Sequence, residues 1–461
     1  MSIRLSETSR NGLMPDRFTG EVILPGDRDY ENARRVWNGM IDRKPRAVLR
    51  ARAVGDIEPA VTMAARHGLP LAIRGGGHSV AGHGTVDGGV VLDLGALNAV
   101  EVDTRRRTVR VQPGATIADV DRATQAHGLA VPLGVVSGTG VAGLTLGGGI
   151  GWLTRRHGLT IDNLIAAELI TASGTTVRAS ETENPELFWG IRGGGGNFGV
   201  ISSFTFRAHR LGPEVLTGTL IYRQAGWAAA LAAYQAWTRD LPDALGSIVS
   251  FLVPPEDWDL GDEPLMLVAF AWTSAHHGEG HRVISRLKRA APPDADDTGP
   301  VRWTSWQSSV DDLFPRGVRA YWKNASLDRI DGAVTAILAR RAAQQRRRGT
   351  GFDLHHMGGA FASIPQDATP FPHRSARYWL NIYGYWPDPA QDLAHTAFIR
   401  GLAADIAPYA TGGRYVNFMA AEDADGPGPV YGPGASARLG ALKKRYDPAN
   451  LFRINHNIAA R

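Results

Sequence analysis

The sequence predicts an α+β protein with two domains, and two observations lead to this prediction. In residues 45–130, short apolar runs alternate irregularly with amphipathic segments, a pattern that favours mixed strands and helices over a regular parallel α/β array. At about residue 212, glycine becomes rarer and tryptophan more frequent, which indicates that a second domain begins there. The 461 residues are enough for two hydrophobic cores.

The elements of the first region follow from periodicity and from glycines that end helices. Helices are expected over residues 56–67, 117–127 and 185–189. Strands are expected over residues 45–53, 71–73, 89–94 and 200–206, and a hairpin over 100–103 and 108–111.

The second region alternates helices with aromatic strands. Helices are expected over residues 225–239, 281–290 and 333–345, and strands over 265–272 and 378–386. Residues 291–294, with two prolines, predict a surface linker, and Asp447-Pro448 predicts a turn. The partly polar aromatic strands could face a substrate.

Composition excludes several kinds of chemistry. The chain has no cysteine, so disulfides, thiolate nucleophiles and cysteine-ligated metals are absent. His355 and His356 would alternate between the two faces of a strand, and we expect no metal site. The net charge of +5 is small, and the arginines near 340–348 fit the end of a helix, so we expect no nucleic-acid partner.

No apolar run is long enough for a membrane span, and the first residues lack the apolar core of a secretory signal. We therefore expect a cytoplasmic protein that does not bind membranes, as a monomer or a homodimer.

The most informative stretch is residues 73–84, Ile-Arg-Gly-Gly-Gly-His-Ser-Val-Ala-Gly-His-Gly. Consecutive glycines allow the backbone N–H groups to form a concave nest for an anion. Arg74 could add a cationic fork, or could instead pair with a nearby carboxylate. His78 would then reach the reactive part of a phosphate-bearing cofactor.

Two further glycine-rich segments, residues 134–151 and 193–199, predict a long ligand such as a dinucleotide lying against the backbone. Both contain a Gly-x-Gly-x-x-Gly match, but neither lies between a strand and a helix in the order that a Rossmann fold requires. No Gly-Lys-Ser/Thr follows any loop, so a P-loop is absent.

The motif from Arg74 to His83 resembles the FAD attachment loop of the berberine-bridge-enzyme-like branch of the vanillyl-alcohol-oxidase/p-cresol-methylhydroxylase (PCMH) flavoproteins. Three other segments match in the same order. They are residues 158–163, 186–200 and the C-terminal signature formed by 415–418 and 444–458.

The resemblance implies a PCMH-type FAD-binding domain over residues 1–210, completed by 416–461. Residues 211–415 would form a substrate domain, an antiparallel sheet backed by helices. It further implies that FAD is bonded covalently through His78 to the 8α-methyl group. Val136 stands where many relatives carry a cysteine, so no second thioether bond is expected.

The resemblance also implies which residues bind FAD. They are Arg74, Gly75, Gly76, Gly77, His78, Ser79, Gly82, His83, Val136, Ser137, Gly138, Thr139, Gly140, Gly143, Leu144, Gly148, Gly149, Gly151, Trp152, Ile161, Gly199, Val200 and Asn455. Thr139 and Val141 would face the flavin ring, where a small side chain near Val141 favours reaction with oxygen, although a packed valine is the alternative.

The catalytic residues implied are Tyr415, Asn417 and Tyr378. Tyr378, Tyr383 and His355 are possible pocket residues, with plain packing as the alternative for each. Tyr415, at the head of a strand-like Tyr-x-Asn-Phe motif, is the first candidate for a base, with Arg414 or Lys323 lowering its pKa. Phe418 replaces a second tyrosine found in many relatives, which weakens the case for sugar oxidation.

We therefore expect an FAD-linked oxidase that converts a small-molecule substrate, an alcohol or amine of specialised metabolism, with dioxygen as electron acceptor. Three alternatives remain open: a flavin-dependent oxygenase, a dehydrogenase with another acceptor, and a non-catalytic flavin-binding protein.

Overall fold

The computed structural model describes residues 15–423 and 428–460. The first sheet has the strand order β1-β2-β4-β3, in which β2, β4 and β3 run parallel and β1 is antiparallel to β2. Its strands are β1 (Glu21–Ile23), β2 (Ala47–Arg50), β3 (Leu71–Arg74) and β4 (Val90–Asp93). Helices α2 (Tyr30–Ala33) and α3 (Ile57–Arg66) belong to the same segment.

A second, antiparallel sheet follows with the order β5-β6-β10-β8-β9. Its strands are β5 (Val100–Asp103), β6 (Thr108–Val111), β8 (Leu164–Ile170), β9 (Thr176–Ser180) and β10 (Val200–Arg207). The helices of this region are α4 (Ile117–Gln125), α5 (Val141–Gly147), α6 (Thr154–His157) and α7 (Pro185–Ile191). Strands β7 (Leu129–Ala130) and β11 (His209–Arg210) form a separate two-stranded sheet in this region.

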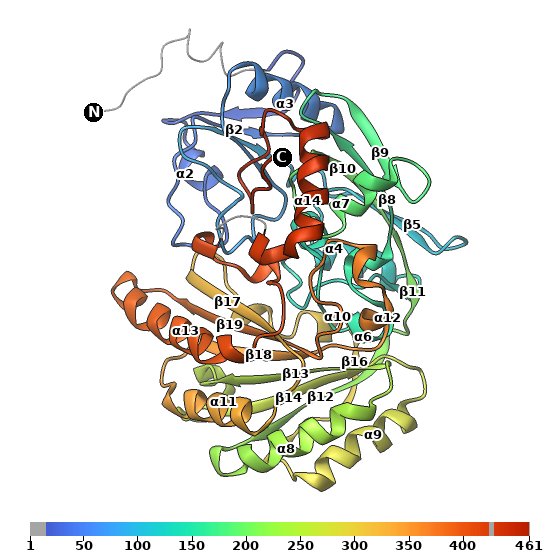
Figure 1. Cartoon of the computed structure of the whole chain (residues 1–461), viewed down its shortest axis with the longest axis vertical. Coiled ribbons are helices and arrows are strands. Elements are labelled where there is room, and N and C mark those ends of the chain that lie inside the picture. The colour runs from blue at the N-terminus through green and yellow to red at the C-terminus, as the bar shows by residue number, and fades with distance from the viewer. Residues whose placement is uncertain (1–14, 424–427, 461) are drawn as a thin grey trace.

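The chain returns to these two sheets at its C-terminal end (Figure 1). Helix α14 (Gly428–Tyr446) packs beside α7, and Leu451 and Phe452 join the core of the first sheet. The fully buried Lys443 ammonium donates to the Asp447 carboxylate at 2.7 Å and to the carbonyl oxygens of Asn197 and Phe452. This ion pair fastens the last residues to the third glycine-rich segment.

The large sheet of the middle region is antiparallel, with the order β15-β12-β14-β13-β18-β19-β17 and β16 paired to β12. Its strands are β12 (Glu214–Tyr222), β13 (Leu245–Leu252), β14 (Leu265–Trp272), β15 (Ala295–Asp296), β16 (Gly299–Arg302), β17 (Arg319–Leu327), β18 (Thr350–His356) and β19 (Tyr378–Trp386). Helices α8 (Trp227–Trp237), α9 (His277–Ala290), α11 (Gly332–Gln344) and α13 (Asp392–Ile406) cover the face farther from the glycine loops (Figure 1).

One face of this sheet packs against the helices and the other faces the cavity. Alternate residues of each strand therefore point to opposite sides. In β19, Tyr378, Leu380 and Ile382 point into the core under the helices. Asn381 points to the opposite face and lines a cavity between the sheet and the glycine loops. The short helices α10 (Trp303–Gln307) and α12 (Ala360–Ser363) lie in the connections between the strands.

The α+β fold class is confirmed, and the predicted strands 265–272 and 378–386 have the observed bounds. The hairpin of β5 and β6 forms as expected. The boundaries at 210 and 415 stay a prediction. No helix in the described ranges is long and apolar enough to cross a membrane.

Candidate cofactor and substrate site

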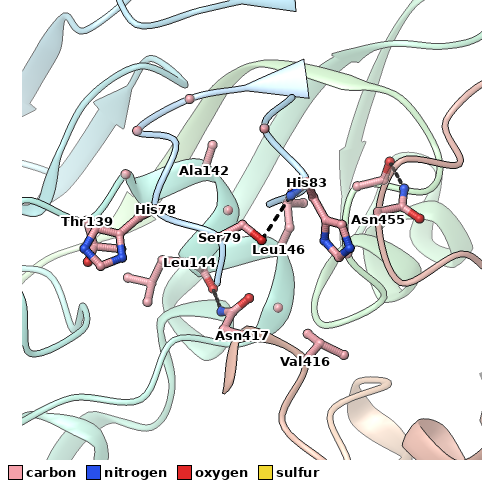
Figure 2. A pocket seen from close by; sticks show the side chains of 18 of the residues that line it. His78, Ser79, His83, Thr139, Ala142, Leu144, Leu146, Val416, Asn417 and Asn455 are labelled. Carbon is pink, nitrogen blue, oxygen red and sulfur yellow. Dashed lines mark hydrogen bonds between the residues drawn. The ribbon is translucent and has the colours of Figure 1, made fainter. Parts of the chain in front are cut away.

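One elongated cavity lies between the three glycine-rich segments and the large sheet. Figure 2 shows His78 and Thr139 at one end and His83 and Asn455 at the other, with Asn417 between them. The predicted residues that line it are Arg74, Gly75, Gly76, Gly77, His78, Ser79, His83, Val136, Thr139, Gly140, Gly143, Leu144, Gly199, Val200, Tyr415, Asn417 and Asn455.

The first two glycine segments meet backbone to backbone. A β-carbon on Gly76 would lie 2.6 Å from the backbone nitrogen of Gly140, and one on Gly140 would lie 2.4 Å from that of Gly76. Gly77 has a φ of 69°, which glycine adopts without strain. Only residues without a side chain allow this contact, so the bare N–H groups stay close to the cavity.

Arg74 does not offer a free fork to an anion. Its guanidinium, 7% exposed, donates to the Asp93 carboxylate at 2.8 Å and to the backbone oxygens of Ala33 and Arg35. The salt bridge to a nearby carboxylate is therefore the role that the structure shows for this side chain.

His78 stacks on the indole of Trp37, with ring centroids 4.4 Å apart and an angle of 18° between the planes. The Trp37 indole N–H donates to the Phe314 carbonyl oxygen at 3.0 Å, which fixes the indole. Burial, with a smaller contribution from the Arg316 cation, lowers the pKa of His78 to about 4. The imidazole is therefore neutral and keeps a free lone pair at neutral pH.

The remaining predicted FAD-binding residues lie outside the cavity wall: Gly82, Ser137, Gly138, Gly148, Gly149, Gly151, Trp152 and Ile161. Ser137 binds the Asp311 carboxylate through its N–H at 2.7 Å and through its hydroxyl. Trp152 packs on Trp306, and Ile161 is fully buried.

Four glycines of this group, Gly82, Gly148, Gly149 and Gly151, pack closely against other parts of the chain, whereas a β-carbon on Gly138 would meet no atom within 4 Å. A β-carbon on Gly151 would lie 1.8 Å from the Leu133 oxygen, and one on Gly149 would lie 2.0 Å from Thr160 Oγ1. Gly82, with a φ of 74°, packs on Ile41. A glycine in the sequence indicates a position with little room for a side chain, but it does not show whether protein or cofactor fills the space beside it.

The predicted gate residue Val141 is also packed. Its side chain is fully buried in the core of the second sheet, and Ala142 is the residue that lines the cavity. The alternative of a packed valine is thus the observed one.

Tyr415 is held by three N–H groups instead of by a cation. Its hydroxyl oxygen accepts from Gly149 N at 2.9 Å and Asn417 Nδ2 at 2.8 Å, and also from Ile150 N. Burial outweighs these bonds and raises the pKa of Tyr415 to about 12.

Two expectations about this motif are corrected. Residues Val416–Phe418 form a 3-10 turn and not a strand. Lys323 and Arg414 both pair with Asp423, so neither cation binds the Tyr415 hydroxyl.

The structure also corrects the interpretation of Tyr378 as a pocket residue. Its side chain points under helix α8, where its hydroxyl shares a hydrogen bond with Thr238 at 2.6 Å. The alternation of β19 explains this, because Asn381 and Tyr378 are an odd number of positions apart and face opposite sides.

The large sheet forms the other wall of the cavity, where His355 was expected from the sequence and Asp353 was not. Asp353 of β18 pairs in register with Ser250 of β13 and with Asn381 of β19. His355 faces the same side and lines the cavity with Trp322 and Phe314. The signal in the sequence was weak, because Asp353 lies in a strand that also contains Thr350 and two histidines and is not uniformly apolar.

Asp353 is the acidic group of this wall. Its carboxylate accepts from the Tyr383 hydroxyl at 3.1 Å and from the Ser250 hydroxyl. Burial raises the pKa of Asp353 to about 7, against the opposing effect of these two bonds. A carboxyl with such a pKa can accept a proton near neutral pH.

Comparisons with known proteins identify the family. Residues 45–180 match the family model described as FAD binding domain, and 414–459 match the one described as berberine and berberine like. The FAD-linked oxidoreductase pgmH of Aspergillus terreus is 30% identical over 477 residues, covering 93% of this chain and 92% of that protein. The chain is a berberine-bridge-enzyme-like FAD-linked oxidoreductase.

Other proteins similar to this oxidoreductase are oxidases by name. The (R)-6-hydroxynicotine oxidase of Paenarthrobacter nicotinovorans is 28% identical over 464 residues, covering 96% of this chain and 97% of that protein. The crystal structure of 6-hydroxy-D-nicotine oxidase from Arthrobacter nicotinovorans superposes with a TM-score of 0.87 at 27% identity, covering 97% of this chain and 99% of that chain. A chitooligosaccharide oxidase, at 20% identity and a TM-score of 0.86, shows the shared fold alone.

The oxidoreductase has a cavity whose residues fit FAD. The paired glycine segments leave room for backbone approach along its length. At the end near Asn455, the Asn455 Oδ1 and His456 Nδ1 atoms are buried without a hydrogen-bond partner within the described ranges. Unpaired buried polar atoms indicate that a polar group belongs there, and a dinucleotide supplies such groups.

Proposed function

We propose that this oxidoreductase carries FAD bonded covalently through His78 and oxidises a small organic alcohol or amine, with dioxygen as electron acceptor. The proposal rests on the position of the Asp353 side chain. It is a carboxylate on the sheet side of the same cavity that the glycine segments line on the other side.

The covalent attachment is supported by the state of His78. A nucleophile must present a lone pair, and the buried imidazole keeps one because its pKa is about 4. Stacking on Trp37 holds the ring in one orientation. Val136 lines the cavity and has no sulfur, so the proposal includes a single bond to the flavin.

When bound, FAD supplies the acceptor for a hydride from the substrate carbon. The chain has to hold the substrate and accept its proton, and Asp353 is the group placed to do so, assisted by the Tyr383 hydroxyl. Asn417 and the backbone near Gly149 position Tyr415 as part of the cavity wall. Ala142 adds a small side chain there, which is compatible with oxygen access.

The test is the purified holoenzyme and its His78→Ala variant, examined before and after acid precipitation. The proposal expects flavin colour in the wild-type pellet and none in the variant pellet. Oxygen uptake with a panel of alcohols and amines then tests the acceptor. Flavin released by acid contradicts the covalent bond, and flavin that substrates reduce but air does not reoxidise contradicts dioxygen as acceptor.

A further inference from the structure

The charge of the cavity wall limits the substrates that it can hold. Among the cavity-lining residues that the structure describes, Arg74 and Asp353 carry the charged groups, and Arg74 is already paired with Asp93. Burial lowers the pKa values of the four lining histidines, His78, His83, His355 and His456, so they are neutral. Asp353 therefore supplies the uncompensated charge, which is negative when the carboxyl is ionised.

No cation pairs with Asp353 within residues 15–423 and 428–460. Its hydrogen bonds come from two hydroxyl groups, and no Lys, Arg or His of the described residues forms an ion pair with it. A buried carboxylate without a counter-ion is unfavourable, and a cation that enters the cavity would relieve this cost.

Aromatic rings surround the space near this carboxylate. The Phe314 ring lies 6.2 Å from the Trp322 ring and 6.0 Å from the Tyr383 ring, while Phe418 lies 5.7 Å from Trp322. Faces and edges of this kind favour planar apolar groups and cations, because the ring faces carry negative partial charge.

Two buried polar atoms beside Asp353 have no hydrogen-bond partner among the residues that the structure describes. They are Nε2 of His355 and Oδ1 of Asn381, and each of these residues is 4% exposed and lines the cavity. The amide oxygen can only accept a hydrogen bond, and the neutral imidazole has one nitrogen that accepts. Their placement suits a ligand group with more than one N–H donor.

We infer that the substrate is a cationic amine on a planar apolar body, bound with its N–H toward Asp353 and its body against Trp322 and Phe314. A carboxylic acid or a phosphate ester would face Asp353 without a cation to pair with. A neutral sugar would leave the carboxylate without a counter-ion. This inference rests on the proposed oxidation and narrows it to amines.

The chemistry of this step balances. The N–H bond of the ammonium breaks and its proton passes to the Asp353 carboxylate, which leaves a lone pair on nitrogen. The hydrogen of the adjacent C–H bond leaves with its electron pair as a hydride, for which bound FAD would be the acceptor, and the nitrogen lone pair forms a C=N bond. The substrate loses two electrons, FAD gains them, and water hydrolyses the iminium product to a carbonyl compound and an amine.

The test uses three probes with one ring and different charges: N-methylbenzylamine, benzyl alcohol and benzoate. Binding to the holoenzyme is measured under anaerobic conditions from the shift in the flavin absorption spectrum, and reduction from its bleaching. We expect the amine to bind at least about tenfold more tightly than the alcohol, and benzoate to give no saturable shift. Asp353→Asn should remove the preference for the amine.

The matched control is Asp262→Asn, because Asp262 is an exposed carboxylate that pairs with Arg348, and neither residue lines the cavity. It should keep the preference, and Asp353→Glu should restore part of it. Equal binding of amine and alcohol, or a preference retained in Asp353→Asn, overturns the inference. If the alcohol alone reduces the flavin, the proposed oxidation stands and the amine inference fails. If no probe reduces it but the amine still binds through Asp353, the oxidation fails instead.

Discussion

The imidazole of His78 lies stacked against the indole of Trp37, 4.4 Å between centroids, and the indole is fixed by its hydrogen bond to the Phe314 carbonyl. Trp37 belongs to a segment near the N-terminus and Phe314 to the connection before β17. The ring proposed to bind the flavin is thus oriented by two distant parts of the chain.

Replacing Trp37 tests this orientation. An aromatic contact of this kind contributes roughly 0.5–1.5 kcal/mol, so Trp37→Leu should slow flavin attachment by about three- to tenfold, whereas Trp37→Phe should retain most of the rate. The fraction of flavin that stays in the acid precipitate, followed over time after FAD is added to apoprotein, measures this. An unchanged rate in Trp37→Leu would show that the stack has no part in attachment.

The contact between Gly76 and Gly140 predicts a strong effect of a single methyl group. Because a β-carbon at either position would lie within 2.6 Å of backbone atoms, Gly140→Ala should separate the two segments and prevent FAD loading. The ratio of bound flavin to protein, read from the absorption spectrum, is the measurement. Gly55→Ala is the control, since a β-carbon there meets no atom within 4 Å and Gly55 lies outside the three glycine-rich segments. Normal loading of Gly140→Ala would refute the close approach.

The pH dependence of oxidation should report Asp353. A base must be ionised, and the pKa of Asp353 is raised to about 7, so kcat/KM should rise as the pH increases through about 7 and fall below it. In Asp353→Asn this limb of the profile should be absent. A rate that is independent of pH between 5 and 8 in the wild type, with a substrate that does not titrate in that range, would exclude Asp353 as the proton acceptor.

Tyr415, unlike Asp353, is expected to stabilise the fold and not to accept the substrate proton. Its hydroxyl accepts three N–H groups and its pKa is raised to about 12, so it is protonated at neutral pH. Tyr415→Phe leaves buried donors unpaired and should lower stability by about 1–3 kcal/mol, seen as a lower Tm, with a modest loss of kcat. A loss of activity beyond about a thousandfold at unchanged Tm would instead make Tyr415 the proton acceptor.

The buried pair of Lys443 and Asp447 should be essential for the C-terminal tail. Removing one partner leaves an uncompensated buried charge, which costs about 3–5 kcal/mol, so Lys443→Met should unfold at a much lower temperature than the wild type. The Lys443→Met/Asp447→Leu double variant should recover part of the loss. Equal Tm values for wild type and Lys443→Met would show that the pair is not needed.

Much of the fold could be predicted because its elements obey local rules. The strand Tyr378–Trp386 and the helix Ile57–Arg66 have clear apolar periods and clear ends. The sequence could not reveal that the short parallel strands 47–50, 71–74 and 90–93 share a sheet, because pairing depends on contacts distant in the chain.

The cavity was predicted where glycines line it, and of the strand residues that line it His355 was a candidate but Asp353 and Asn381 were not. Gly76 and Gly140 are informative because only glycine fits. Asp353 and Asn381 become significant only when the register of β18 and β19 brings them together. Tyr378 is the opposite case. It was predicted to be a site residue because it is a tyrosine, but its position in β19 turns its side chain into the core, where it binds Thr238.

The C-terminal return of the chain has a consequence for the order of assembly. Phe452, Asn455 and His456 line the same cavity as His78, and Lys443 fastens them to the Asn197 carbonyl. During synthesis the glycine segments emerge well before these residues, so the cavity wall is complete only once residues 452–456 have been made. Binding of FAD in the finished cavity therefore has to follow their synthesis, and a chain truncated before Phe452 would leave this part of the cavity open to water.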